Sequence, residues 1–267
     1  MIGFKLCKNG KLSDIDSNYI LEFKFDGVRC MLIKKGEEIN LINREQNNIT
    51  KYFPEIVNEA KRLKDGMYDG EIICGNYEDG KRVWKNCGDF HKIQKRFVED
   101  KRKINLLSKT IHSKFIIFDY ICDKPLLERK KIIEQIIPLK ELATYKYIYV
   151  SPYFYYYKLD DLWKTIKQLN LEGLVAKRKD SYYNDLRNDE WIKVKNRKEM
   201  VIEFDKYEKH EAGVLLIKGD LRVNLNGKES EKAIKLIEKQ GFVRCEVEYL
   251  DKEDSGLLRQ GVVKRVL

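Results

Sequence analysis

A lysine flanked by carboxylates stands out in the segment Glu22–Arg29, where charged residues alternate with two phenylalanines. Alternation with a period of two is typical of a β-strand, which places Glu22, Lys24 and Asp26 on one face. Such a group is either a solvated strand edge or a site with a lysine nucleophile, and the segment alone leaves both interpretations open. Gly27 then allows a turn or a close approach of the backbone to a ligand.

Other predicted strands carry groups that suit chemistry on phosphate. Carboxylates such as Glu71 and Glu172 can hold Mg²⁺ on a phosphate. Lys193 and Lys195 share one face of their strand and can neutralise a phosphate under attack. Phe118 can stack on a base. A lysine attacks only when deprotonated, which nearby positive charge or a metal favours. The set predicts phosphoryl or nucleotidyl transfer with a covalent lysine step.

Strands and helices alternate along the first part of the chain, and these elements position the polar groups. Period-two and β-branched runs predict strands, and apolar stripes with proline starts predict helices. The strands are expected at 22–33, 39–42, 67–74, 114–120, 145–157, 171–177 and 191–195, and the helices at 54–63, 125–137 and 161–169. The tyrosines of 145–157 are interpreted mainly as packing residues, with base stacking as the less favoured alternative.

The composition changes after Lys198. Residues 1–198 carry a net charge of +11, and residues 199–267 carry −1. The second part is expected to form strands near 200–208, 213–218, 221–225, 242–250 and 257–266, with a helix from Ser230 to Gly241. Five strands with a helix between the third and fourth are typical of an OB-fold barrel. We therefore predict two domains, 1–198 and 199–267.

The whole chain of 267 residues has a net charge of +10, which favours a polyanionic partner such as nucleic acid. The stretch 81–114 is the most basic, with 11 Lys and Arg against three acids. It is interpreted either as amphipathic helices with solvated lysines or as a phosphate-tracking surface, and we favour the second. The six cysteines form no C-x-x-C pair, and no secretory or membrane segment is recognised. A cytoplasmic protein that is not secreted is expected, in a bacterial, phage or viral context.

Six short motifs in the right order resemble those of ATP-dependent DNA ligases of the covalent nucleotidyltransferase superfamily, and the likeness covers essentially the whole chain. Each motif is weak alone, but the ordered set is specific. The matching segments are Lys24–Arg29 (K-x-D-G-x-R), Asn43–Glu45, Asp69–Glu71, Phe118–Tyr120, Glu172–Lys177 and Trp191–Lys195.

The resemblance implies a role for each matching residue. Lys24 would attack the α-phosphate of ATP and form a lysyl-AMP, while Phe118 stacks on adenine. The nucleotide and phosphate contacts implied are Glu22, Arg29, Arg44, Glu71, Arg187, Lys193 and Lys195, and the ligands implied for Mg²⁺ or Mn²⁺ are Glu172, Glu71 and Asp26. AMP would pass to a DNA 5′-phosphate, and the 3′-hydroxyl would displace it.

The implied fold is α+β, with an antiparallel-sheet nucleotidyltransferase domain (ATP-grasp-like) followed by a C-terminal OB-fold β-barrel. The implied partner is nicked duplex DNA, encircled by a monomer. The family's motif VI, R-x-D-K, is incomplete here, and only Arg259, Lys264 and Arg265 are available for its task. An RNA ligase or an mRNA-capping guanylyltransferase is the alternative with the same lysine chemistry. A non-catalytic, OB-containing nucleic-acid-binding protein is a further alternative.

Overall fold

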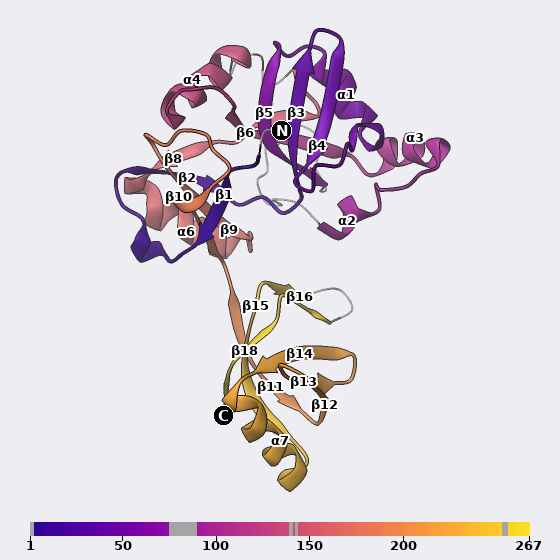
Figure 1. Cartoon of the computed structure of the whole chain (residues 1–267), viewed down its shortest axis with the longest axis vertical. Helices are drawn as coiled ribbons and strands as arrows, with labels where there is room; N and C mark the ends of the chain where they lie inside the picture. The colour runs from indigo at the N-terminus through magenta and orange to yellow at the C-terminus, as the bar shows by residue number, and fades with distance from the viewer. Residues whose placement is uncertain (1–2, 75–89, 139–140, 142–143, 253–255) are drawn as a thin grey trace. The chain divides into compact units, whose positions relative to one another are not determined.

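The computed structural model describes residues 3–74, 90–138, 141, 144–252 and 256–267. The chain forms two compact units, Met1–Val194 (unit 1) and Lys195–Leu267 (unit 2), each with its own core (Figure 1). Within the described ranges, no helix has the length and apolar character needed to span a membrane. The first part of the basic stretch 81–114, residues 81–89, lies outside the described residues.

Unit 1 contains a five-stranded sheet in the order β4-β3-β5-β6-β7. Neighbouring strands in this sheet are antiparallel, except β6 and β7, which run parallel. One face is covered by α1, α2 and α4, whose apolar side chains join the sheet in one core (Figure 1). The bounds are β3 Val28–Lys35, β4 Glu38–Asn43, β5 Gly66–Cys74, β6 Ser113–Tyr120, β7 Ile148–Val150, α1 Pro54–Ala60, α2 Phe90–Gln94, α3 Lys101–Thr110 and α4 Leu126–Ile136.

A second five-stranded sheet of unit 1 has the order β1-β10-β9-β2-β8. Helix α6 packs on it, and Ile73 and Ile116 of the first sheet share its core. The two sheets therefore pack face to face, so side chains at their edges can meet. The bounds are β1 Leu6–Asn9, β2 Tyr19–Phe23, β8 Tyr153–Tyr155, β9 Gly173–Arg178, β10 Arg187–Lys195 and α6 Leu159–Gln168, with short 3₁₀ turns η1 Leu12–Asp14, η2 Thr50–Tyr52 and η3 Tyr156–Lys158.

Two glycines explain local features of these strands. Gly36 has φ +58° in the two-residue turn between β3 and β4, where a side chain would be strained. A Cβ on Gly27 would lie 2.1 Å from the carbonyl oxygen of Ile72. The close approach expected at Gly27 is therefore to the backbone of β5.

Two predicted strands differ from the structure. The first ends at Phe23, so Lys24 and Asp26 follow β2 in a connection that leads to β3. The run 145–157 is divided between β7 in one sheet, β8 in the other and η3, with the strand interrupted at Ser151–Pro152. The interpretation of its tyrosines as packing residues is wrong for three of them, since Tyr155, Tyr156 and Tyr157 are exposed.

Unit 2 is built from short antiparallel strands around one core that also includes α7. Its sheets have the orders β11-β15-β18 and β12-β13-β14, and β14 lies against β18 and β11 against β13. This arrangement matches the predicted OB fold. The bounds are β11 Lys198–Phe204, β12 Lys206–His210, β13 Gly213–Lys218, β14 Leu221–Asn226, α7 Lys228–Gln240, β15 Val243–Tyr249, β16 Asp251–Lys252, β17 Leu258–Arg259 and β18 Val262–Val266.

The end of α7 follows the prediction, because Gly241 takes the left-handed conformation with φ +84° that stops a helix. Its start is two residues earlier than expected, at Lys228. Two predicted strands of unit 2 are each divided, at Asp205 and between Arg259 and Val262.

Candidate active site

A cavity in unit 1 brings together most of the predicted site residues. It contains about 830 Å³ of empty space, part of it open to solvent. Its walls come from both sheets. The predicted residues that line it are Glu22, Lys24, Arg29, Arg44, Glu71, Phe118, Arg187 and Lys193.

Three predicted residues are not in the cavity wall. Glu172 bonds to Lys24, and Asp26 is close enough to Lys24 and Glu71 to act on their charges. Lys195 belongs to unit 2, where its Nζ donates to Oε1 of Gln260 at 2.7 Å. Lys193 and Lys195 therefore do not share one environment, although they share one face of β10.

Lys24 is held in a charged pair. Its backbone N–H donates to the carbonyl oxygen of Gly173 at 2.9 Å, and its Nζ donates to Oε2 of Glu172 at 2.7 Å. Burial disfavours the ammonium, but attraction to Glu172 and Glu71 outweighs it and raises the pKa of Lys24. The ligand-free protein thus keeps Lys24 protonated, opposite to the state that a nucleophile needs.

Glu71 lies on β5 directly opposite Arg29 of β3. Burial raises the pKa of Glu71 to about 7, against the attraction of Lys24 and Arg29. The carboxylate of Glu172 repels it as well. At neutral pH Glu71 is therefore only partly ionised, and a cation arriving beside it would favour the ionised form.

The carboxylates present fit a divalent cation that shares its ligands with a substrate. In the described part of the chain, no three His, Cys, Asp or Glu side chains form a ready cage. Mg²⁺ is usually bound by one or two carboxylates together with substrate phosphates and water. Glu71 and Glu172, which both act on the charge of Lys24, could serve as such a pair.

Several cations that line the cavity lie close enough to Lys193 to repel it. Burial lowers the pKa of Lys193, and repulsion from Lys24, Arg187 and Arg44 lowers it further. Cations that repel one another beside an open cavity gain from an anion between them. A nucleoside polyphosphate is such an anion.

Aromatic rings form another part of the wall. Phe118 of β6 and Trp191 of β10 meet edge to face, with ring centroids 6.2 Å apart. The Nζ of Lys177 is 4.2 Å from each ring centroid, and burial lowers the pKa of Lys177 to about 8. Glu22 is bridged by Lys130 at 2.6 Å and Lys177 at 3.0 Å. Flat apolar faces beside a fixed carboxylate suit a heterocyclic base.

Arg29 is fixed by partners from three segments. It forms two bonds to the buried carboxylate of Asp69, from Nε at 2.7 Å and from a terminal nitrogen at 2.6 Å. The hydroxyl of Tyr183 donates to the same carboxylate at 2.6 Å. The guanidinium carbon of Arg29 is 4.6 Å from the ring centroid of Phe118. This geometry orients Arg29 and the aromatic wall together.

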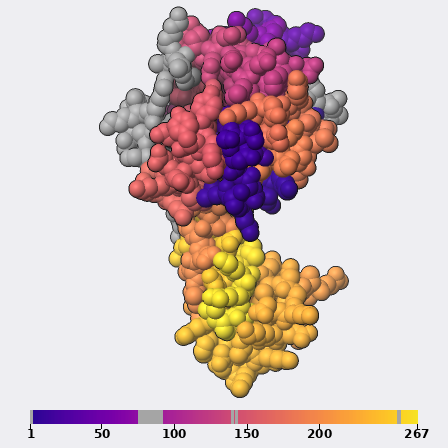
Figure 2. Space-filling view, turned by 90° about the vertical axis from the view of Figure 1, so that its left-hand side faces the viewer, coloured from indigo at the N-terminus to yellow at the C-terminus, as the bar shows by residue number. Residues whose placement is uncertain are grey.

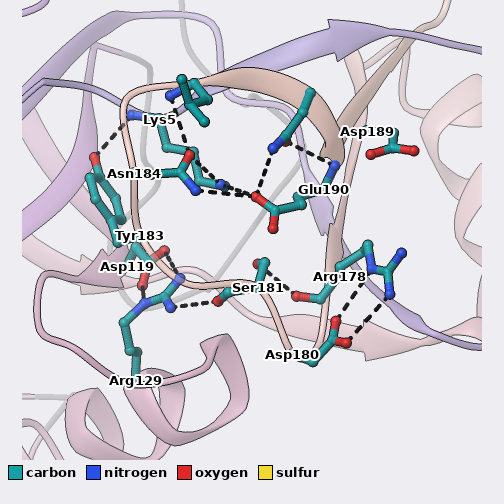
Figure 3. A network of polar contacts seen from close by, with 12 residues as sticks. Lys5, Asp119, Arg129, Arg178, Asp180, Ser181, Tyr183, Asn184, Asp189 and Glu190 are labelled. Atoms are coloured by element: carbon teal, nitrogen blue, oxygen red, sulfur yellow. Dashed lines mark hydrogen bonds and ion pairs between the residues drawn. The ribbon is translucent and has the colours of Figure 1, made fainter.

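The connection between β9 and β10 is held by buried cations (Figure 3). Arg129 binds Asp119 through two bonds and donates to the carbonyl oxygen of Ser181 at 2.7 Å. The Nζ of Lys5 donates to Oδ1 of Asn184 at 2.8 Å and pairs with Glu190. The connection leads into β10, so this network positions the strand that carries Arg187, Trp191 and Lys193.

The sequence did not predict several of these contacts. Lys177 and Trp191 lie within predicted strands and within two of the matching motifs, but no role was predicted for either residue. Lys130 follows Glu128 and Arg129 in a run that is typical of a solvated helix face, yet Lys130 is buried. No pattern near Lys5 indicates its buried partners.

The chain is similar in sequence to known DNA ligases. A DNA ligase-like protein of the SPbeta prophage, LigB of Bacillus subtilis, is 30% identical over 194 residues, covering 68% of this chain and 62% of its own length. A DNA ligase of Sulfolobus acidocaldarius is 26% identical over 200 residues, covering 69% of this chain and 31% of its own. The chain thus spans less than two thirds of these relatives.

Solved structures share the fold at low identity. A Lig E DNA ligase superimposes with a TM-score of 0.72 at 17% identity, with both chains fully covered. A structure titled Pmar-Lig_Pre superimposes with a TM-score of 0.75 at 16% identity, covering 99% of this chain and 67% of its own.

The profile of one family, described as the ATP dependent DNA ligase domain, matches residues 6–195. That match includes every strand and helix that builds the cavity, and the chain therefore belongs to the ATP-dependent DNA ligase domain family.

Proposed function

We propose that this protein is an ATP-dependent DNA ligase that seals nicks in duplex DNA through a covalent lysyl-AMP. The observation that carries the proposal is Lys24, paired with Glu172 at 2.7 Å beside a cavity lined by cations and aromatic rings. The relatives named as DNA ligases and the Lig E structure, whose title describes DNA binding, support the choice of DNA.

In the first step, the Nζ of Lys24 attacks the α-phosphorus of ATP, a P–N bond forms, and pyrophosphate leaves. Arg187, Arg44 and Lys193 neutralise the phosphates, since their charges converge on the cavity. Phe118 and Trp191 take the base, with Glu22 at its edge. Lys24 must lose its proton before it attacks, which requires the pair with Glu172 to be broken.

Glu71 and Glu172 would hold Mg²⁺, or Mn²⁺, which when bound supplies positive charge to the phosphates. Engagement of Glu172 elsewhere removes the attraction that raises the pKa of Lys24. The electrostatics of the ligand-free site thus favour attack only once substrate and cation are in place. Asp26, which also acts on Lys24 and Glu71, adds negative charge to the same site.

In the second step, an oxygen of the DNA 5′-phosphate attacks the AMP phosphorus and the P–N bond to Lys24 breaks. In the third, the 3′-hydroxyl attacks the 5′-phosphate, loses its proton and releases AMP. We assign adenylyl transfer to the predicted domain 1–198 and additional DNA contacts to the predicted OB domain 199–267. The protein acts as a monomer that encircles the duplex, in the cytoplasm.

Unit 2 carries the basic residues available for the task of the incomplete motif VI, which we assign to the first step, the transfer of AMP to Lys24. Lys264 pairs with Glu199, and Arg265 pairs with Glu246 at 2.6 Å. Lys264, Glu199 and Arg265 are largely exposed, so these pairs are weak. Both cations can therefore leave their partners and become available to an anion.

The test is the intact mass of the protein after incubation with Mg²⁺ and either ATP or GTP. We expect an AMP adduct with ATP, absent in Lys24→Ala and in Lys24→Arg, because a guanidinium stays protonated. A GMP adduct would indicate a capping enzyme. Nicked DNA and nicked RNA duplexes then separate DNA ligase from RNA ligase. If the wild-type protein forms no adduct and also leaves a pre-adenylylated nick unsealed, it is not a ligase.

A further inference from the structure

Three consecutive tyrosines are exposed on unit 1, where β8 ends and η3 begins. Tyr155, Tyr156 and Tyr157 have 43%, 38% and 77% of their surface exposed. None of the three lines the cavity described above. The part of unit 1 that carries them, salmon in Figure 2, reaches the molecular surface. Exposed, contiguous aromatic side chains on a folded unit mark a binding surface more often than chance.

Two of these rings are aligned with each other. The ring planes of Tyr155 and Tyr157 lie within 10° of parallel, and their centroids are 6.4 Å apart. Tyr155 ends β8 and Tyr157 lies in η3, so the change from strand to 3₁₀ turn brings the two rings into this alignment. We call Tyr155 and Tyr157 the tyrosine platform. Two near-parallel faces present the same orientation to flat ligands, as successive bases of one strand require.

Each ring of the tyrosine platform has a cation beside it. The Nζ of Lys158 is 5.7 Å from the ring centroid of Tyr157, and the Nζ of Lys179 is 5.4 Å from that of Tyr155. Lys158 also pairs with Asp161 at 3.5 Å, but both side chains are at least half exposed, so the pair is weak. A nucleic acid strand presents flat bases and negative phosphates in alternation. The tyrosine rings can stack on its bases, and the neighbouring ammonium groups can contact its phosphates.

The position of β8 leaves the platform accessible. β8 is the outer strand of its sheet, bonded only to β2 within that sheet. A second copy of the chain is disfavoured as the occupant, because each copy carries a net charge of +10. The flanking cations disfavour an apolar partner for the same face. The partner that fits this face best is therefore a polyanion with exposed aromatic rings.

We propose that the tyrosine platform, with Lys158 and Lys179, is a binding site for single-stranded DNA, separate from the cavity. Bases stack on Tyr155 and Tyr157 while the ammonium groups contact phosphates. A duplex hides its base faces within the stack, so it cannot use this surface in the same way. The site therefore serves unpaired DNA next to a break. It does not depend on the ligase activity proposed above.

The experiment measures the affinity of a fluorescent oligo-dT of about 12 nucleotides by anisotropy, over a range of salt concentrations. In Tyr155→Ala/Tyr157→Ala we expect the dissociation constant to rise at least about fivefold, from the loss of base stacking. The slope of log Kd against log salt should stay unchanged, because no cation is removed. In Lys158→Gln/Lys179→Gln we expect that slope to fall.

Matched variants exclude indirect effects. Tyr155→Phe/Tyr157→Phe keeps both rings and should keep wild-type affinity. Tyr182→Ala removes another exposed tyrosine, 51% accessible, and should have no effect. Formation of the lysyl-AMP should be equal in all variants, which shows that unit 1 is folded. The proposal is wrong if wild-type protein does not bind oligo-dT, or if Tyr155→Ala/Tyr157→Ala binds it as tightly as Tyr182→Ala does.

Discussion

Lys5→Met removes a buried positive charge from the network of Figure 3 while keeping a side chain of similar length. Lys5 is fully buried, and its Nζ bonds to Asn184 and Glu190. Loss of one partner of a buried ion pair costs about 3–5 kcal/mol. Here Glu190 keeps 27% of its side chain exposed and a bond from Asn188 at 3.0 Å. We therefore expect unit 1 to lose about 2–3 kcal/mol in free energy of unfolding.

Urea unfolding followed by tryptophan fluorescence measures this loss in unit 1 alone. The three tryptophans all precede residue 195, so unit 2 contributes no signal. Lys5→Met/Glu190→Gln should lose clearly less than the sum of the two single variants, since the charges are removed together. Phe4, Leu6 and Cys7, which flank Lys5, line the cavity, so Lys5→Met should also weaken ATP binding.

The pH dependence tests the electrostatic part of the argument. Burial opposes ionisation of Glu190, but bonds from Lys5 and Asn188 outweigh it and lower the pKa of that carboxyl. A carboxyl with a lowered folded pKa stabilises the protein above its unfolded pKa, about 4.3, and this contribution is lost as the pH falls through the folded pKa. The difference between wild type and Lys5→Met should be full at pH 7 and shrink below about pH 4. A loss under about 1 kcal/mol at pH 7, or a loss independent of pH, would refute the reasoning.

Three further predictions concern the cavity, the fold and the basic surface. Because the pKa of Glu71 is about 7 and the metal needs the ionised carboxylate, the Mg²⁺ concentration for half-maximal lysyl-AMP formation should fall as the pH rises from 6 to 8. Glu71→Gln should raise this Mg²⁺ concentration and remove the part of its pH dependence that comes from ionisation of Glu71. An unchanged Mg²⁺ concentration would exclude Glu71 as a ligand. Gly27→Ala places a Cβ 2.1 Å from the oxygen of Ile72, so β3 and β5 must separate; we expect a loss of about 3 kcal/mol or more in urea unfolding, and a loss like that of Gly36→Ala would contradict this. Affinity for nicked duplex should fall steeply with salt, and replacing Lys101, Arg102 and Lys103 of α3 with Gln should reduce the slope by about 0.9 for each phosphate that the variant no longer neutralises; an unchanged slope would place the DNA elsewhere.

The sequence predicted the cavity well where the residues lie on regular strands. Alternation put Glu71 and Lys193 on polar faces, and such faces are recognisable because one side of each strand must be buried. It placed Lys24 within a strand, whereas β2 ends at Phe23. That end depends on pairing with β9 and β8, which local alternation does not report.

Buried cations were beyond sequence reasoning for a different physical reason. Arg129 and Lys130 lie in a charged run on α4 and have the types of residues that are almost always solvated. They are buried because Asp119, Glu22 and the carbonyl oxygen of Phe118 accept their bonds. These partners come from β6, which directly precedes α4, and from β2, which is far away in the sequence. The exposure of the three tyrosines has the same origin, since it depends on β8 being the outer strand of its sheet.

The charges around Lys24 suggest how the site could keep the amine protonated without substrate and allow its deprotonation when substrate binds. In the absence of substrate, Glu172 and Glu71 raise the pKa of Lys24, so the amine is unreactive. Burial and then the surrounding cations lower the pKa of Lys193 instead, and these cations mark where an anion would be stabilised. In the proposed mechanism, ATP would supply that negative charge, and a cation bound by the carboxylates would weaken the attraction that keeps Lys24 protonated. The proton on Lys24 would then be lost only when the substrate is present, which would protect the lysine from side reactions in the free protein.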